Sequence, residues 1–345
     1  MARILIIRFS AIGDVAMTAP IVHSLATQYP QHEITVLSRT PLKPIFKELP
    51  SNVHFLGVDL KGEYSGILGL NKLYKMLAGM NFDYVADFHN VLRSKYLGLR
   101  FKLSGIPVVT LDKGRAGKKK LVRRKNKVFK RQKSLFQRYT EILEKLGFPI
   151  SANFDSIYGE GRGDFSKIES VVGEKTQKWL GIAPFAQHKG KIYPIEKMEQ
   201  IVAHFTQDKR VKIFLFGGGP KEEVVFNGWV AKYPNVISMI GKFDMEKELI
   251  LMSYLDMMLS MDSANMHLAS LVNTPVLSIW GATHPYAGFL GWKQLPTNTI
   301  QIEDMPCRPC SVYGQKECFR KDYACLNQIK PEVVIDRIER DFSLS

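Results

Sequence analysis

The sequence predicts an α/β protein of two Rossmann-like, doubly wound domains that face each other across a cleft. Short apolar runs alternate with amphipathic stretches in the N-terminal half, and the same rhythm restarts in the second half. This alternation favours parallel sheets covered on both faces. Residues 151–166, rich in Gly, Ser, Asn and Asp, read as a linker between the halves. With 345 residues, the chain is long enough for two cores.

The predicted elements give domain boundaries at residues 1–155 and 165–330. In the first half, the predicted strands are Arg3–Arg8, Glu33–Ser38, Val53–Gly57, Tyr84–Asp87 and Ile106–Thr110, with a helix over Val15–Gln28. In the second half, the predicted strands are Trp179–Ala183, Val211–Phe216, Val236–Ile240, Met257–Met261 and Pro275–Ile279. The helices there are Glu196–Phe205, Glu222–Lys232, Lys247–Leu255 and Ala264–Val272. The sequence leaves open whether a last helix, Pro331–Phe342 within 331–345, crosses back to the first domain.

The composition is that of a globular protein, with 45% hydrophobic and 23% charged residues. No stretch approaches the eighteen or so apolar residues that a membrane span needs. The N-terminal apolar run is about four residues long and ends in Arg8, too short for the core of a signal peptide. We therefore expect a cytoplasmic protein.

A carboxylate lies in the first strand-to-helix turn. The segment Arg8-Phe9-Ser10-Ala11-Ile12-Gly13-Asp14 follows the apolar run Ile4–Ile7 directly. In open α/β sheets this turn lies at the carboxyl ends of the strands, where ligands bind. Asp14 is therefore a candidate for chemistry. Its alternative role is to cap the following helix.

Three further polar segments follow strands of the second half. The first is the basic loop from Pro184 to Pro194, which includes Lys191; the second is Gly217-Gly218-Gly219-Pro220-Lys221-Glu222. The third runs from Asp262 through Ser263 and Ala264 to His267, with Ser263 as a predicted N-cap. Glycines and helix starts offer amides to phosphate, and carboxylates suit ribose hydroxyls. Together these segments indicate a nucleotide-diphosphate site, although a triple glycine is often a plain loop and a single His such as His267 is often structural.

These motifs, taken in order, resemble glycosyltransferase family 9, the heptosyltransferases that build the lipopolysaccharide inner core. The resemblance covers the whole chain and includes Ser-Ala-Ile-Gly-Asp, Lys-Ile-Tyr-Pro, Gly-Gly-Pro-Lys-Glu and Asp-Ser-Ala-Asn-Met-His-Leu-Ala. It implies the GT-B fold and inverting transfer without a catalytic metal. It also implies a nucleotide-sugar donor such as ADP-heptose and an anionic, lipid-linked saccharide acceptor at the inner face of the inner membrane.

The resemblance also assigns roles by position. Asp14 matches the catalytic base, Lys191 the lysine that neutralises the donor phosphates, and Glu222 the acid at the ribose. The other residues expected to bind the donor are Gly218, Gly219, Asp262, Ser263, Ala264 and His267. The chain departs from the family where Phe185 and Ala264 replace common glycines, which bears on the identity of the donor sugar.

The net charge of +15 is concentrated in one segment. Between Lys113 and Lys133 there are twelve Lys or Arg and no acid, which leaves about +3 for the rest of the chain. We expect this segment to meet the anionic membrane face or a phosphorylated acceptor through Lys118, Lys119, Lys120, Arg123, Arg124 and Lys125. A mobile, solvated loop is the alternative. Little aromatic interleaving argues against nucleic acid.

All four cysteines lie within 19 residues: Cys307, Cys310, Cys318 and Cys325. Three interpretations stay open, namely a structural metal such as zinc, reduced packing thiols and a redox pair.

Two other classes of protein are also open. A Rossmann-like dehydrogenase is disfavoured because the first turn has one glycine rather than a spaced set. A non-catalytic protein that binds anionic surfaces through the basic segment is the other.

Overall fold

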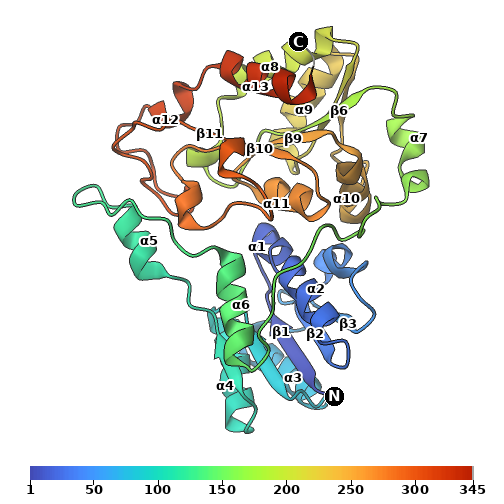
Figure 1. The fold of residues 1–345 in the computed structure, drawn as a ribbon, viewed down its shortest axis with the longest axis vertical. Coiled ribbons are helices and arrows are strands. Elements are labelled where there is room, and N and C mark those ends of the chain that lie inside the picture. Colours follow the sequence, from blue (N-terminus) through green and yellow to red (C-terminus); the bar gives the residue numbers. More distant parts are fainter. Residues whose placement is uncertain (344–345) are drawn as a thin grey trace. The chain divides into compact units, whose positions relative to one another are not determined.

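The computed structural model describes residues 1–343, which form two compact units (Figure 1). The first unit contains residues 1–115 and 133–159. The second contains residues 116–132 and everything from residue 160 onward. Residues 116–132, which make up most of the basic segment, thus belong to the second unit, although the sequence places them within the first domain.

The first unit is built on a five-stranded parallel sheet in the order β3-β2-β1-β4-β5. Its strands are β1 (Arg3–Ile7), β2 (Glu33–Arg39), β3 (Val53–Val58), β4 (Tyr84–Asp87) and β5 (Val108–Thr110). All five strands were predicted within two residues. The chain order reverses between β1 and β4, the position where open α/β sheets bind ligands.

The helices of the first unit cover this sheet. They are α1 (Ile12–Ala16), α2 (Ala19–Gln28), α3 (Gly66–Ala78), α4 (Leu92–Leu103) and α6 (Leu135–Lys145), with a 3-10 helix at Thr40–Phe46. The single helix predicted over Val15–Gln28 is wrong. Pro20 lies in the first turn of α2, where its missing N–H is tolerated, so the chain ends α1 and restarts. On one face, α3 and α4 share a core with β1 and β4.

The second unit holds a six-stranded parallel sheet in the order β11-β10-β9-β6-β7-β8. Its strands are β6 (Lys178–Ala183), β7 (Val211–Leu215), β8 (Val236–Ser238), β9 (Met257–Met261), β10 (Val276–Ile279) and β11 (Thr299–Ile300). Only β11 was not predicted, because two residues carry no periodic signal. The order reverses between β6 and β9.

The helices of the second unit are α8 (Ile195–Gln207), α9 (Pro220–Lys232), α10 (Met245–Tyr254), α11 (Ala264–Leu271), α12 (Ala324–Asn327) and α13 (Pro331–Phe342). Shorter helical turns are α7 (Glu169–Val172) and α5 (Arg115–Leu121), with 3-10 turns at Phe165–Lys167, Lys189–Lys191, Pro285–Ala287 and Pro296–Asn298. The terminal helix α13 packs on α8 and buries Val334 and Ile338 in the core of this unit. It belongs to the second unit. No helix within residues 1–343 is long and apolar enough to cross a bilayer.

Candidate functional site

Asp14 lies at the reversal point of the first sheet, on the short helix that follows β1. Its carboxylate forms an ion pair with the Arg8 guanidinium and accepts a 3.4 Å hydrogen bond from the Ala11 amide. The side chain is 31% exposed, whereas that of Arg8 is 6% exposed. The carboxylate of Asp14 is thus held by Arg8 and Ala11, while part of its surface is exposed to solvent. Asp14 is the third residue of α1 and not its N-cap, which is Ala11, and its side chain is accessible for chemistry.

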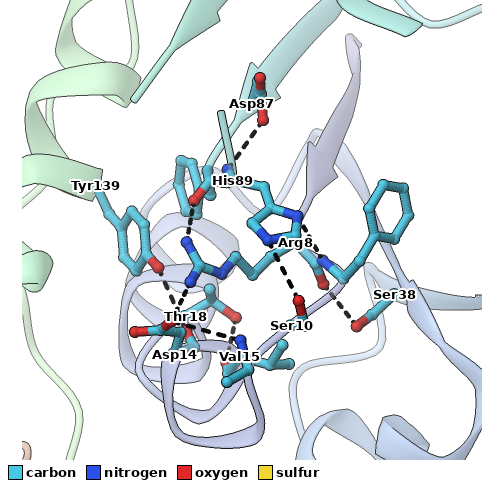
Figure 2. A network of polar contacts seen from close by, with 12 residues as sticks. Arg8, Ser10, Asp14, Val15, Thr18, Ser38, Asp87, His89 and Tyr139 are labelled. Atoms are coloured by element: carbon cyan, nitrogen blue, oxygen red, sulfur yellow. Dashed lines mark hydrogen bonds and ion pairs between the residues drawn. The ribbon is translucent and has the colours of Figure 1, made fainter. Parts of the chain in front are cut away.

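Arg8 is fixed by the neighbouring strand. Its guanidinium donates to the carbonyl of Phe88, directly after β4, over 2.7 Å. Figure 2 shows this guanidinium between the β4 end and Asp14, with the Tyr139 hydroxyl 3.3 Å from the Asp14 carbonyl. Adjacent strands therefore orient one carboxylate.

His89 completes this network as a neutral ring. Burial, reinforced by the charge of Arg8, lowers the pKa of His89 to about 3. Its Nδ1 accepts from the Phe9 amide over 3.4 Å, which leaves the Nε2 proton directed at Ser10 Oγ, also 3.4 Å away. The buried Asp87 carboxylate accepts the His89 amide over 2.9 Å and so fixes this loop. Sequence reasoning missed His89, although it follows a predicted strand just as Asp14 does.

Positive charge gathers around this carboxylate. Burial and the charges of Arg8 and Arg115 lower the pKa of Lys113. The charges of Lys113 and Arg93 act in the same direction on the pKa of His89. Asp14 and Asp87 act on the pKa of Lys113 in the opposite direction, so cations and carboxylates influence one another at this edge. This edge of the first sheet is suited to an anionic ligand.

At the second sheet, the reversal point brings Lys191 and Asp262 together. Lys191 follows β6 and Asp262 follows β9, and the ammonium lies 3.0 Å from the carboxylate. The side chains are 16% and 5% exposed. The sequence predicted that both residues line one donor site; the structure places them in direct contact, and the donor role stays a prediction.

The start of α11 lies beside this pair. Ser263 occupies the predicted N-cap position, but its hydroxyl does not bond the helix and lies 3.2 Å from Ser260 Oγ. The first amides of α11, beginning with Ala264, are therefore not capped by that side chain. His267 is buried, 8% exposed, one turn into the helix. An uncapped helix start is suited to an anion.

The glycine segment follows β7, the strand on the other side of β6. Gly219, with φ +103°, precedes Pro220 at the start of α9, and no side chain caps this helix. The Glu222 carboxylate accepts the Gly218 amide over 2.8 Å. Burial raises the pKa of Glu222, and that hydrogen bond opposes the rise. Glu222 is thus fixed to the glycine segment at the same sheet edge.

The long irregular loop between β11 and α12 packs against the segment that carries Lys191. Gly190 accepts the Ala282 amide over 2.8 Å, and the Ala282 carbonyl in turn accepts the Ser311 amide over 3.1 Å. Gly314, with φ +80°, lies against the stem of Lys191, because a Cβ added there would be 2.7 Å from Lys191 Cγ. This contact was not visible in the sequence.

The four cysteines, all free, line one cavity between this loop and the start of α12. Burial raises the pKa of Cys310, and it raises the pKa of Cys325 to about 12. Within residues 1–343, no group of three or more His, Cys, Asp or Glu side chains is arranged to hold a metal ion. The three interpretations of these thiols stay predictions.

The basic segment is partly docked on its own unit rather than uniformly solvated. Lys127 donates to the carbonyls of Pro306, Arg308 and Pro309 over 3.0, 2.6 and 3.1 Å. Lys118 is only 5% exposed, with its ammonium 4.1 Å from the centre of the Phe289 ring. The prediction that Lys118 meets a membrane is therefore wrong. The remaining predicted cations are exposed: Lys119, Lys120, Arg123, Arg124 (over the Phe319 ring) and Lys125.

Known structures share this architecture of two Rossmann-like units. A family 9 glycosyl transferase from Veillonella parvula superposes with a TM-score of 0.76 at 21% identity, covering 100% of this chain and 98% of the other. The Escherichia coli ADP-heptose lps heptosyltransferase II gives 0.71 at 18% identity, with 99% of each chain covered. The fold is therefore the GT-B glycosyltransferase fold.

The family follows from the sequence match. The model described as glycosyltransferase family 9 (heptosyltransferase) matches residues 70–318, so the chain belongs to this family and is a glycosyltransferase. A curated relative, the lipopolysaccharide core heptosyltransferase OpsX of Haemophilus influenzae, is 23% identical over 283 residues, which are 81% of this chain and 79% of the relative.

Proposed function

We propose that this protein transfers a heptose from a nucleotide-diphosphate donor, ADP-heptose, to a lipopolysaccharide core acceptor with inversion at the anomeric carbon. The family and the relatives named for lipopolysaccharide heptose transfer support this substrate class. The observation that carries the proposal is the pairing of Lys191 with Asp262 beside the uncapped start of α11. Cation, amides and glycines at one sheet edge suit a sugar diphosphate.

Asp14 acts as the general base. Its carboxylate takes the proton from the acceptor hydroxyl while that oxygen attacks the anomeric carbon. Arg8 and the Ala11 amide orient the carboxylate, and its exposed face receives the hydroxyl. A base of this kind typically contributes about 10²–10⁴-fold to the rate.

Lys191 and the first amides of α11 stabilise the leaving group. As the bond from the anomeric carbon to the phosphate oxygen breaks, its electron pair stays on the diphosphate. Lys191 neutralises this negative charge, and Asp262 holds the ammonium in place. The reaction needs no metal for this step, since these protein groups supply the positive charge. Glu222 binds the ribose hydroxyls.

The acceptor is anionic and membrane-bound. The cations near Asp14, Lys113 and Arg93, are suited to acidic groups on such an acceptor. The exposed cations of the basic segment hold the enzyme peripherally at the inner face of the inner membrane. Each Lys or Arg near anionic lipid contributes about 1 kcal/mol.

A donor panel tests the proposal. ADP-heptose, other ADP-sugars and UDP-sugars are offered with a detergent-dispersed core acceptor, and product is identified by mass and anomeric configuration. We expect saturable transfer from ADP-heptose with inversion. Transfer from another sugar nucleotide instead would keep the class of reaction and replace the donor, while no transfer by a folded chain would contradict the proposal.

A sedimentation assay tests the role of the basic segment. Replacing Lys119, Lys120 and Lys125 by Ala should weaken binding to vesicles with anionic lipid, most clearly at low salt. The control replaces three exposed lysines elsewhere in the second unit, Lys209, Lys242 and Lys330. Equal losses in both variants would show a general charge effect rather than a docking segment.

A further inference from the structure

Helix α4 of the first unit has apolar residues on two opposite faces. Its inner face buries Leu97 and Phe101 in the core shared with the sheet. Its outer face exposes Leu92, Leu99 and Leu103, whose exposed fractions are 86%, 57% and 76%. Single exposed leucines are ordinary, but three on one helix face form a surface that water disfavours.

The three leucines form one line along the helix. At 3.6 residues per turn, they fall within about 40° of one another around the helix axis. Tyr96 lies in the same sector. The buried residues occupy the opposite side, so the exposed line points directly away from the core.

Basic residues flank this line on both sides. By the same geometry, Lys95 and Lys102 lie on one flank, and Arg93 and Arg100 on the other. Residues 92–103 contain no Asp or Glu. Lys95, Lys102 and Arg93 are exposed, while Arg100 donates to Asn71 Oδ1 over 2.6 Å and so ties α4 to α3. An apolar line between two basic rows is the pattern of helices that lie in a membrane interface.

Helix α3, which neighbours α4, also exposes apolar side chains. It packs beside α4, with its Tyr74 hydroxyl 2.6 Å from Ser104 Oγ at the end of α4 (Figure 1). Its first residues expose Ile67 and Leu68, at 68% and 82%. The first unit therefore has further exposed apolar side chains on the helix that neighbours α4.

We propose that the outer face of α4 is a membrane-docking surface, in which the leucine line enters the acyl boundary and the flanking cations bind anionic headgroups. Charge complementarity selects this occupant: an acid-free, basic-flanked leucine surface matches an anionic bilayer better than the mixed surface of a protein. This surface is separate from residues 116–132 of the basic segment, which belong to the second unit. It adds apolar insertion to the electrostatic attraction described above.

The position of α4 fits a membrane-borne acceptor. The helix begins at Leu92, three residues after His89, at the carboxyl end of β4. Docking through this helix brings lipid headgroups to the sheet edge that carries Asp14. This last point rests on the proposed function, whereas vesicle binding itself does not.

Vesicle binding without donor or acceptor tests the inference. The probe is vesicles of phosphatidylethanolamine and phosphatidylglycerol, with brominated acyl chains in a second set. We expect the variant Leu92→Ser/Leu99→Ser/Leu103→Ser to bind at least about tenfold more weakly than the native chain. The matched control, Val224→Ser/Leu295→Ser/Val333→Ser, removes three exposed apolar side chains of the second unit and should bind normally.

Insertion has its own readout. A tryptophan introduced by Leu99→Trp should be quenched by the brominated lipids, and one introduced by Val224→Trp should not. Transfer to a deacylated, water-soluble acceptor should be unchanged in the leucine variant, which shows that it is folded. Native vesicle binding by that variant, an unquenched Leu99→Trp, or dimerisation through this face without vesicle binding would each overturn the inference.

Discussion

Lys191 and Asp262, from the turns after two adjacent strands, form an ion pair of 3.0 Å that is largely shielded from water. Removing one member of such a pair leaves a buried charge without its partner. We expect Lys191→Met to lower the free energy of unfolding by about 3 kcal/mol and transfer by about 10²–10³-fold. Chemical denaturation and steady-state kinetics measure the two effects.

A double variant separates the structural from the catalytic part of this pair. Lys191→Met/Asp262→Asn removes both charges, so most of the lost stability should return. Transfer should stay low, because nothing neutralises the departing diphosphate. Recovery of activity together with stability would show that Lys191 acts only on the fold.

Asp14 is predicted to act on the acceptor and not on the donor. Asp14→Asn keeps the size of the side chain and removes its basicity. We expect kcat to fall by about 10²–10⁴-fold while the donor Kd, measured by calorimetry, is unchanged. The matched control is Glu48→Gln, an exposed carboxylate of the same unit, which should leave both values unchanged. Native turnover in Asp14→Asn would remove this residue from the mechanism.

The sequence was sufficient to predict that the candidate site residues follow strands of the two sheets. Buried strands produce continuous apolar runs, and the polar residues directly after them fall at one edge of a parallel sheet. This argument placed Asp14, Lys191 and Asp262 at strand ends, where the structure has them. The contact of Lys191 with Asp262 follows because β6 and β9 are neighbours, a fact of strand order and not of local sequence.

Contacts between distant segments were beyond the sequence. His89 follows β4 and contacts Ser10, which follows the neighbouring strand β1. Gly314 lies against Lys191, although more than a hundred residues separate them in the sequence. Neither has a periodic or motif signal. Lys118 shows the converse, since a lysine within a charged run is normally solvated, yet the Phe289 ring covers its ammonium. Only the tertiary fold selects which cation of the run is covered.

Glu248, in the first turn of α10, predicts a pH-dependent stability. Burial raises its pKa from 4.5 to about 7, so folding favours the protonated form. The free-energy cost of ionising Glu248 in the folded protein is absent below about pH 4.5. It grows as the pH rises and reaches its full value above about pH 7. Glu248→Gln should therefore stabilise the protein by about 2–3 kcal/mol at pH 8 and much less at pH 5.

Thermal unfolding at both pH values measures this effect. For a unit of this size, the expected rise in Tm at pH 8 is roughly 5 °C or more. Glu174→Gln removes an exposed carboxylate of the same unit and should shift Tm equally little at both pH values. A gain that is the same at pH 5 and pH 8 would contradict the role of ionisation.

Gly314 is predicted to position Lys191 for the donor. Its φ of +80° strains any other residue, and an added Cβ would lie 2.7 Å from Lys191 Cγ and 3.2 Å from its Cδ. Gly314→Ala should displace the lysine stem and raise the KM for the donor by about tenfold, which corresponds to about 1.4 kcal/mol of lost binding. The KM for the acceptor should be unchanged.

Gly105→Ala is the matched control for backbone strain. Gly105 has the same φ of +80°, but nothing lies within 4 Å of the position of its added Cβ. Both variants should lose about 1–2 kcal/mol of stability from the left-handed backbone, and only Gly314→Ala should also change the donor KM. Equal donor KM values in the two variants would show that Gly314 serves the loop alone. Gly314 lies between Cys310 and Cys318 in the sequence. A higher donor KM in Gly314→Ala alone would therefore show that the cysteine-bearing loop positions Lys191 for the donor.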